Sequence, residues 1–501
     1  MRDLLFGDRP LSVGDIVSVA RDRARVELAP GARAAIAAGH SALLQFIGAG
    51  GVVYGVTTGL GAAVDTQLGS IDSALLQQRI PLARSVGVGR HASSEEVRAI
   101  MAARLGRLTL GRSGISLAAA EALAMLLNAH IHPVTPMTGS VGEADLAPLA
   151  HIASVVFGAG EAEMDGTVMT GAEAFARSGL MTPEPGPKDG LALVSSNAAS
   201  VGLGALAVYD ARRVLAGLLG AACLSLEGFR ANLSPLSPAA VRLHPVPGLD
   251  RVAKCVFKLL GDSDLARPGM SRRLQDPLSF RCLGPVHAAT LSALDSAAAI
   301  VDIELNSSDD NPAILGGQSL VLPNASFDAT HLALAFEGLA LALSRAAALS
   351  GERIMQLMSP AASDLPRFLA PPLEGRSGFS ALQKTVSALV ADIQFKASPM
   401  PVVILAVADR VEDYGTMATA SVLKAREIAE QLRVLAAIEM MVAAQACDLR
   451  PGVVLGGQMA TLHEMVRRLV SRLDDDRAVA PDIAALVAAL RDRDVTEAFL
   501  L

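Results

Sequence analysis

Aromatic residues are scarce in this sequence. They make up 3% of the 501 residues and Trp is missing altogether, although 51% of the residues are hydrophobic. The core must therefore be built from Ala, Leu, Val, Ile and Met. Such side chains favour helices that pack closely together, so the composition predicts a mostly α-helical protein with a large core.

Long runs of one charge are also missing. The formal net charge is -7, and no basic cluster provides the footprint that nucleic acid or an anionic membrane surface would need. No nucleic-acid partner and no membrane are therefore expected. Chemistry on a small-molecule substrate is the better expectation.

Cysteine is rare, and the four cysteines lie far apart without a C-x-x-C pair: Cys223, Cys255, Cys282 and Cys447. This spacing argues against a disulfide framework or a metal knuckle and fits a reducing cytoplasmic location. The N-terminal residues lack the apolar run of a signal peptide, so no export is expected. The nine histidines show no H-x-x-x-H spacing, and no metal is predicted.

Two apolar segments, 198–226 and 332–358, are long enough to raise the question of a membrane span. Charged residues interrupt both of them, and charges are costly in hydrocarbon. We expect central helices of a large soluble bundle, apolar nearly all round because neighbouring helices cover every side.

The remaining pattern is helical from about residue 90 to 130 and again from 198 onward, with a long helix expected over 415–446. Breaks rich in Pro and Gly occur at 183–190, 234–248 and 370–378. We take the first break as a domain boundary. It separates a mixed N-terminal part, residues 1–190, from a helical bundle with C-terminal helices, residues 191–501.

Several polar islands interrupt this apolar background in a fixed order. They read V-Y-G-V-T-T-G-L-G, G-S-V-G-E-A-D-L-A-P-L, S-S-N, Q-D-P-L-S-F-R-C, N-S-S-D-D-N-P, S-F-D and R-V-E-D-Y, and they span Val53 to Tyr414. Together they resemble the histidine and phenylalanine ammonia-lyase family, which carries Y-G-x-N-T-G-F-G, G-S-V-G-A-S-G-D-L-A-P-L, Q-D-x-Y-S-x-R, a D-N-P turn and Q-E-D-H in the same order. The resemblance implies a long central helical bundle and a homotetramer with active sites shared between subunits.

The family's electrophile is the most conspicuous departure. In the family an Ala-Ser-Gly triplet cyclises into a methylidene-imidazolone group that activates the amine as a leaving group. Here Glu143 and Ala144 stand between G-S-V-G and D-L-A-P-L, so two residues replace three and neither is the required Ser or Gly. In addition, Ser195 and Leu278 occupy positions where the family has Asn and Tyr. We therefore predict that the protein has no methylidene-imidazolone and no other cofactor.

Other positions of the family's site are retained. The resemblance places Tyr54 at the proton-abstracting tyrosine, Arg281 at the residue that binds the substrate carboxylate, and Glu412 at a substrate-contacting glutamate. A planar and permanently charged guanidinium suits a carboxylate. These residues favour a working enzyme over a dead one.

Two charged residues are gained relative to the family pattern. Lys384 lies in an apolar helical stretch where the family has an aliphatic residue, and Arg84 lies where histidine-using relatives have His. A lysine among apolar neighbours often has a shifted pKa and a catalytic role. The alternative is a surface lysine whose charged end reaches solvent. Arg84 either contacts the substrate or pairs with an acid.

Without the electrophile, the substrate's nitrogen must already be a good leaving group. A trimethylammonium group meets this condition because it departs as neutral trimethylamine. The pattern is similar to the ergothionase branch of the family, which converts ergothioneine to thiourocanate. This similarity assigns Tyr54 as the base for the β-proton, Arg281 as the carboxylate clamp, and Lys384 and Glu412 as acid or ring contacts. Further pocket candidates are Gln275, Asn197, Phe327, Arg84 and Glu143, the last closing the emptied loop.

Three other interpretations remain open. The substrate could be a related betaine such as hercynine, because the ring-facing residues do not say whether sulfur is recognised. The chain could be a histidine-type ammonia-lyase that uses some other electrophile. It could also be a non-catalytic homologue that binds a small molecule or assembles with an active relative.

Overall fold

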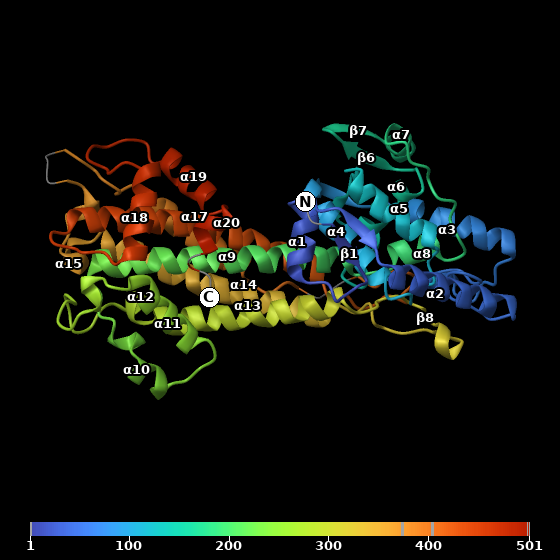
Figure 1. The fold of residues 1–501 in the computed structure, drawn as a ribbon, viewed down its shortest axis with the longest axis horizontal. Coiled ribbons are helices and arrows are strands. Elements are labelled where there is room, and N and C mark those ends of the chain that lie inside the picture. Colours follow the sequence, from blue (N-terminus) through green and yellow to red (C-terminus); the bar gives the residue numbers. More distant parts are fainter. Residues whose placement is uncertain (1–2, 372–374, 402–404, 498, 500–501) are drawn as a thin grey trace. The chain divides into compact units, whose positions relative to one another are not determined.

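Long helices dominate the chain, as predicted. The computed structural model describes residues 3–371, 375–401, 405–497 and 499. Its longest helices are α9 (Ala198–Phe229), α13 (Leu283–Leu305), α14 (Thr330–Leu357) and α17 (Ala418–Leu449) (Figure 1). The two apolar segments predicted as central helices correspond to α9 and α14. The helix expected over 415–446 is α17.

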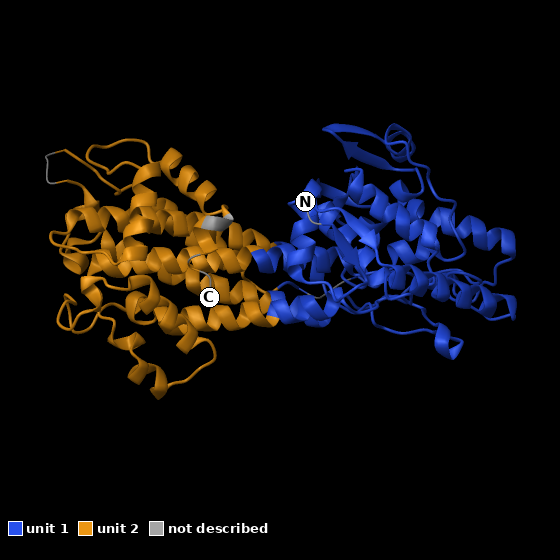
Figure 2. Cartoon of the chain, viewed as in Figure 1, with its two compact units in different colours: residues 1–209, 297–336, 400–423 blue, residues 210–296, 337–399, 424–501 orange. Residues whose placement is uncertain are grey.

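The chain divides into two compact units, each assembled from several stretches of sequence. Unit 1 comprises residues 1–209, 297–336 and 400–423, and unit 2 comprises residues 210–296, 337–399 and 424–501 (Figure 2). Each of the four long helices contributes residues to both units. The boundary expected at residue 190 lies inside unit 1.

Unit 1 combines helices with small sheets. Strands β1 (Leu4–Phe6) and β2 (Val26–Leu28) pair in parallel; β3 (Val88–His91) pairs antiparallel with β5 (Pro136–Thr138), and β8 (Ala313–Leu315) with β9 (Leu320–Leu322). A fourth sheet has three strands in the order β4 (His132–Pro133), β6 (Glu161–Met164), β7 (Thr167–Thr170). The helices up to α9 are α1 (Val13–Ala20), α2 (Pro30–Gly48), α3 (Ser70–Arg84), α4 (Ser94–Leu108), α5 (Leu117–Asn128), α6 (Leu146–Val156), α7 (Gly171–Arg177) and α8 (Asp189–Val194).

Local sequence explains where several of these helices begin. Ser12, Ser93 and Thr170 each accept a hydrogen bond from the backbone three residues later, where an acidic side chain reaches back to the cap. Such capping boxes satisfy backbone N–H groups that the first turn would otherwise leave without partners. They set the starts of α1, α4 and α7.

Small residues let the helices of unit 1 approach closely. A Cβ added at Gly202 in α9 would lie 2.6 Å from the backbone oxygen of Ala99 in α4. The first half of α9 is buried from Ala198 to Val208. This close contact is what the scarcity of aromatic residues predicts, because a bulky side chain would force the two backbones apart.

Among its described residues, unit 2 consists of helices and the loops between them, without a strand, and it has a buried ion pair in its core. Its shorter helices are α10 (Pro238–Leu243), α11 (Leu249–Leu260), α12 (Leu278–Arg281), α15 (Pro360–Ser363), α16 (Leu382–Lys396), α18 (Gly457–Leu469), α19 (Ala480–Ala489) and α20 (Arg493–Glu497). Arg353 of α14 donates to Glu439 of α17 at 2.6 Å, and Ser225 and Ser350 also donate to that carboxylate. Because these partners are buried and come from α9 and α14, the Glu439 carboxylate links three of the long helices, α9, α14 and α17.

Three helical stretches among the described residues are long and apolar enough to cross a membrane, judged by length and composition: Asp189–Phe229, Leu283–Leu305 and Thr330–Leu357. In the first, 94% of the most apolar window is buried inside the protein; in the other two, the shares are 39% and 50%.

Candidate active site

The predicted base, Tyr54, lies on the loop that follows α2. Its hydroxyl oxygen accepts a hydrogen bond from the Gly61 N–H at 2.9 Å. The loop is held by Gln77 of α3, which is fully buried and donates to the Gly55 carbonyl at 2.9 Å while accepting from the Leu191 N–H at 3.1 Å. Gln77 was not among the predicted residues, because its role depends on this contact with a distant loop.

A glycine is required in this loop for a specific reason. Gly55 has a φ of +67°, and a Cβ there would lie 2.4 Å from Leu60 and 2.8 Å from Leu191. A side chain at this position would therefore displace the turn that carries Tyr54.

Arg84, the last residue of α3, gathers with Tyr54 and Glu412. Burial lowers the pKa of the half-buried Arg84 guanidinium, and the charges of Tyr54 and Glu412 act in the opposite direction. Glu412 closes a small turn in which its backbone pairs with Val407. Ala408 of that turn lies near Gly61, at 3.4 Å from the position of an added Cβ. Three predicted site residues thus come together in unit 1.

The loop that carries Glu143 and Ala144 is anchored by the next residue, Asp145. This carboxylate is fully buried and accepts hydrogen bonds from the Ser140 hydroxyl at 2.7 Å, the Ser200 N–H at 2.7 Å and the Thr419 hydroxyl at 2.6 Å. Ala144 has a φ of +60°, a left-handed conformation that costs a non-glycine residue free energy. The loop is therefore held in shape by its surroundings.

Glu143 faces two other carboxylates. Its backbone pairs with Asp328 in an antiparallel bridge, and the two side chains are within hydrogen-bond reach of each other. Burial, together with the charges of Asp328 and Glu412, raises the pKa of Glu143 to about 8. One Glu143 oxygen, Oε1, is buried without a hydrogen-bond partner.

Asp328 is in turn the acceptor for the start of α14. Its carboxylate accepts from the Thr330 N–H and from the Thr330 hydroxyl, both at 3.0 Å. The Tyr414 hydroxyl lies 2.9 Å from the Thr330 hydroxyl oxygen. Phe327, a predicted pocket residue, is half-buried beside Asp328 in the same loop.

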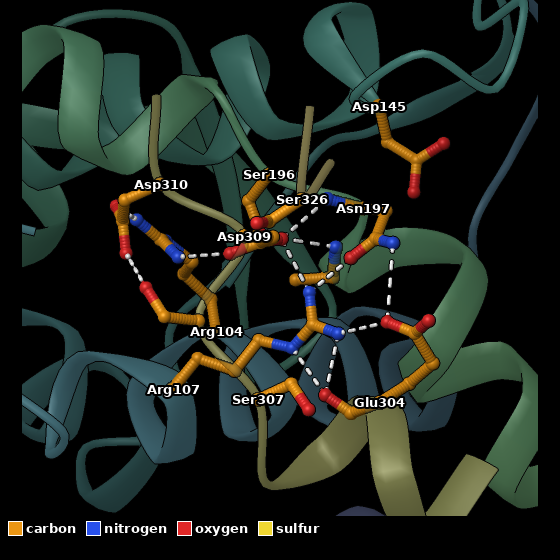
Figure 3. Close-up of polar contacts among 12 residues, drawn as sticks. Arg104, Arg107, Asp145, Ser196, Asn197, Glu304, Ser307, Asp309, Asp310 and Ser326 are labelled. Carbon is orange, nitrogen blue, oxygen red and sulfur yellow. Dashed lines mark hydrogen bonds and ion pairs between the residues drawn. The ribbon is translucent and has the colours of Figure 1, made fainter. Parts of the chain in front are cut away.

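A network of buried charges lies within unit 1 at the start of α9 (Figure 3). Arg104 of α4 pairs with Asp309 at 3.1 Å and with Asp310 at 2.7 Å. Arg107 pairs with Asp309 and, at 2.6 Å, with Glu304 of α13. Burial would raise the pKa of Asp309, but the charges of Arg107 and Arg104 outweigh it and hold this pKa below its usual range.

Asn197 belongs to this network. The fully buried amide accepts from Arg107 and donates to Glu304 at 3.3 Å, and the Asn197 N–H donates to Asp309 at 2.7 Å. Its contact with a substrate, which the sequence suggested, stays a prediction. The neighbouring Ser196 carbonyl accepts from the Asp145 N–H at 2.6 Å, so the network also anchors the loop of Glu143.

The other predicted site residues belong to unit 2. Arg281 ends α12, where its Nε donates to the Asp276 carbonyl at 2.8 Å. With its amide oriented as an acceptor, Gln275 receives a hydrogen bond from Arg281 at 3.1 Å. Lys384, in the first turn of α16, is exposed in the single chain. Gln275 and Arg281 are therefore brought together, while the role of Lys384 stays a prediction.

The described residues include no group of three or more His, Cys, Asp or Glu side chains arranged to hold a metal ion. The absence of a metal from the reaction stays a prediction.

Comparison with known proteins identifies the family. Residues 11–468 match the family model of the aromatic amino acid lyases, and the chain belongs to this family of carbon–nitrogen lyases. Among its relatives are histidine ammonia-lyases of Caldanaerobacter subterraneus subsp. tengcongensis, 33% identical over 99% of this chain and 98% of the relative, and of Gloeobacter violaceus, 36% identical over 97% and 96%.

Solved structures share the fold over nearly the whole chain. Ergothionase from Treponema denticola, in complex with desmethyl-ergothioneine sulfonic acid, is similar with a TM-score of 0.93 and 29% identity over 99% of both chains. Histidine ammonia-lyase from Trypanosoma cruzi is similar with a TM-score of 0.91 and 27% identity over 100% of this chain and 95% of that one.

The family's methylidene-imidazolone does not fit the residues of this loop. Glu143 and Ala144 occupy the place of its precursor triplet, and neither side chain can lose water to form a methylidene group. The Glu143 backbone is paired with Asp328, and the Asp145 N–H is bonded to Ser196. The chemistry must therefore be sought in the side chains that surround the loop.

Proposed function

We propose that this protein eliminates trimethylamine from an imidazole-type amino-acid betaine, with ergothioneine as substrate and thiourocanate as product, without a methylidene-imidazolone. The observation that carries this proposal is the pairing of a loop that lacks the electrophile's precursor with a retained Tyr54. A relative of similar fold, the Treponema denticola protein, is an ergothionase. The substrate's nitrogen must leave without activation, and a quaternary ammonium does so.

Tyr54 is suited to remove the β-proton. The Gly61 N–H donates to its oxygen and so fixes the position of the atom that would accept the proton. The positive charge of Arg84 is close enough to interact with it. When Tyr54, as the phenolate, takes the proton and becomes the neutral phenol, the C–H electrons form the C=C bond and the C–N electrons depart with neutral trimethylamine.

The β-proton needs further acidification, which a charged group near the ring would supply. We assign this role to Lys384, with Glu412 as its partner or a contact to a ring N–H, and the carboxylate clamp to Arg281, supported by Gln275. Lys384 is exposed in the single chain, so it is free to meet a site of another subunit.

A homotetramer with shared sites is part of the proposal. Only 39% of the most apolar window of α13 and 50% of that of α14 are buried within one chain. Apolar helices that are left so open are stabilised when copies of the chain cover them. A cytoplasmic location also belongs to the proposal, supported by four cysteines that form no disulfide in the structure.

A second candidate is ammonia elimination from histidine, favoured by the names of the curated relatives. It requires an electrophile that Glu143 and Ala144 do not provide. A related betaine such as hercynine is a third possibility within the same chemistry. A non-catalytic homologue would explain the altered loop but not the retained Tyr54 and Arg281.

One experiment separates these candidates. The purified protein is incubated with ergothioneine, hercynine and histidine in turn, and trimethylamine, ammonia and the near-ultraviolet absorbance of the acrylate product are followed. We expect trimethylamine and a new chromophore from ergothioneine. Ammonia from histidine would contradict the proposal, and turnover of no substrate would favour the non-catalytic reading.

A further inference from the structure

The amide of Gln77 connects the loop of the proposed base to a second segment of the site. This side chain of α3 is fully buried. Its Nε2 donates to the Gly55 carbonyl at 2.9 Å, and its Oε1 accepts from the Leu191 N–H of α8 at 3.1 Å. A primary amide has both a donor and an acceptor, and here each of them meets a backbone group. Tyr54, directly before Gly55, is thereby tied to α8.

The backbones around Gln77 are in close contact. A Cβ added at Gly190 in α8 would lie 2.1 Å from the Gln77 carbonyl oxygen, and one added at Gly55 would lie 2.8 Å from the Leu191 side chain. The Gly55 N–H also donates to the buried Thr58 hydroxyl at 3.3 Å. Because the interior is close-packed, the turn cannot shift unless α3 or α8 moves with it.

Helix α8 leads directly into the segment that holds the loop of Glu143. Two residues after α8 ends, the Ser196 carbonyl accepts from the Asp145 N–H at 2.6 Å. Asp145 lies two residues after Glu143 in the same loop. A continuous path of covalent bonds and hydrogen bonds therefore runs from Tyr54 through Gln77 and α8 to this loop.

We propose that Gln77 is a positioning residue for the elimination, whose amide fixes the turn of Tyr54 against α8 and so fixes the Tyr54 hydroxyl oxygen relative to the loop of Glu143. The inference rests on the proposed function, in which Tyr54 removes the β-proton. Gln77 acts through the backbone and takes no proton itself. A reacting group displaced by about 1 Å can lose about 100-fold in rate, so a residue that sets the position of the base controls the rate.

Gln77→Met is the first test, because the new side chain fills a similar space without an amide to bridge the two backbones. We expect kcat for trimethylamine release to fall by about 100-fold, while KM stays close to that of the wild type. Gln445→Met is the matched control. Gln445 of α17 is also buried, and its amide donates to the Leu473 carbonyl at 3.1 Å and accepts from the Leu473 N–H at 3.0 Å. We expect it to lower the melting temperature and to leave kcat unchanged.

A measurement that does not depend on turnover uses the scarcity of aromatic residues. The chain has three tyrosines, Tyr54, Tyr209 and Tyr414, and no Trp. Protein labelled with 3-fluorotyrosine should give one fluorine NMR signal for each of them, and Tyr54→Phe identifies the signal of Tyr54. In Gln77→Met this signal should shift or broaden, while the Tyr209 signal keeps its position. Gln445→Met should leave the Tyr54 signal unchanged.

The surroundings of Gln77 allow a second variant to restore its hydrogen bonds at low pH. Helix α3 packs against α6 and α8. On α6, His151 accepts from a backbone N–H; at the start of α8, Lys188 donates to a backbone carbonyl and Asp189 accepts from a backbone N–H. A carboxyl group in place of the Gln77 amide would therefore be buried beside groups that already have partners. Burial raises the pKa of such a carboxyl group and favours its neutral form.

In Gln77→Glu, the neutral carboxyl group has an O–H donor for the Gly55 carbonyl and an acceptor for the Leu191 N–H, whereas the ionised group has acceptors alone. We expect the ratio of variant to wild-type kcat to be near one where the group is neutral and to fall as pH rises between about pH 6 and 9. The fluorine signal of Tyr54 should leave its wild-type position over the same range. Gln445→Glu, which buries a carboxyl group remote from this turn, should show neither change.

An unchanged kcat together with an unchanged Tyr54 signal in Gln77→Met would overturn the inference. Equal losses of kcat in the two Met variants, or parallel pH dependences in the two Glu variants, would also overturn it, because a merely structural role affects both sites alike. If Gln77→Met does not fold, Gln77→Glu decides, since its neutral form retains both hydrogen bonds. A wild type that releases no trimethylamine from ergothioneine would contradict the proposed reaction alone, because the fluorine signals still show whether Gln77 holds Tyr54.

Discussion

Asp309 and Glu143, two carboxylates of unit 1, illustrate opposite uses of an acid away from solvent. Asp309 is paired with Arg104 and Arg107, and its pKa is held low although burial acts to raise it. Glu143 faces other carboxylates, and burial together with their charges raises its pKa to about 8. Burial acts to raise both pKa values and is the largest cause for Glu143, whereas the cationic partners of Asp309 reverse its effect.

The difference separates a structural from a functional environment. The Asp309 network satisfies its charges and ties α4, α9 and α13 together. Around Glu143 the charges are left unbalanced and one oxygen has no partner. Perturbed acids of the second kind gather at active sites, which supports the placement of the reaction at this loop.

The largest expected effect comes from breaking the Asp309 network. Asp309→Asn leaves Arg107 and Arg104 short of a buried counter-charge, which typically costs about 3–5 kcal/mol in the free energy of unfolding. Chemical denaturation measures this loss. Asp250→Asn is the control, because the exposed pair with Lys254 contributes less than about 0.5 kcal/mol; a similar loss in both variants would contradict the assignment.

The next largest effect is expected from substituting Tyr54, the proposed base of the reaction. Tyr54→Phe removes the base, and we expect the rate of trimethylamine release to fall by about 100- to 10,000-fold with little change in melting temperature. Tyr209→Phe, in α9 with its ring against the Arg21 guanidinium, should retain the rate within about twofold. Equal activity in both variants would remove the role of Tyr54.

A smaller effect is expected from two neighbours in the loop of Glu143. A Cβ at Gly142 would overlap the Thr416 hydroxyl, and φ there is +87°, so Gly142→Ala should destabilise the protein by about 2 kcal/mol. Ala144→Gly relieves a left-handed alanine and should stabilise it by about 0.5 kcal/mol. Thermal melts compare the two, and stabilisation by Gly142→Ala would show that the loop has another conformation.

The smallest expected effect is on the pH dependence of stability, which should have opposite signs for Glu143 and Asp309. Because the pKa of Glu143 is raised in the folded protein, its contribution to stability is present at low pH and is lost as pH rises through about 8. The pKa of Asp309 is lowered, so its contribution is present above the ordinary pKa of Asp and is lost as pH falls below it. Denaturation of the wild type against Glu143→Gln and Asp309→Asn across pH should show these opposite trends, and parallel trends would contradict the contrast.

Local sequence was sufficient for much of the fold and part of the site. The apolar, aromatic-poor runs predicted α9, α14 and α17, because helix periodicity and small side chains act over neighbouring residues. The polar islands located Tyr54, Glu143 and Glu412, which the structure gathers in unit 1. The sequence also showed directly that Glu143 and Ala144 replace the three residues from which the family's electrophile forms.

Tertiary structure alone decided which partners these residues have. Arg104 meets Asp309 and Asp310 although they are more than 200 residues away, and Glu143 meets Asp328 in the loop before α14. No local pattern encodes such contacts, because charge and burial depend on which distant segments pack together. For the same reason, the sequence suggested Asn197 as a pocket residue, whereas packing surrounds its amide with buried charges. The sequence also placed Lys384 among apolar neighbours, whereas the fold leaves this side chain exposed in the single chain.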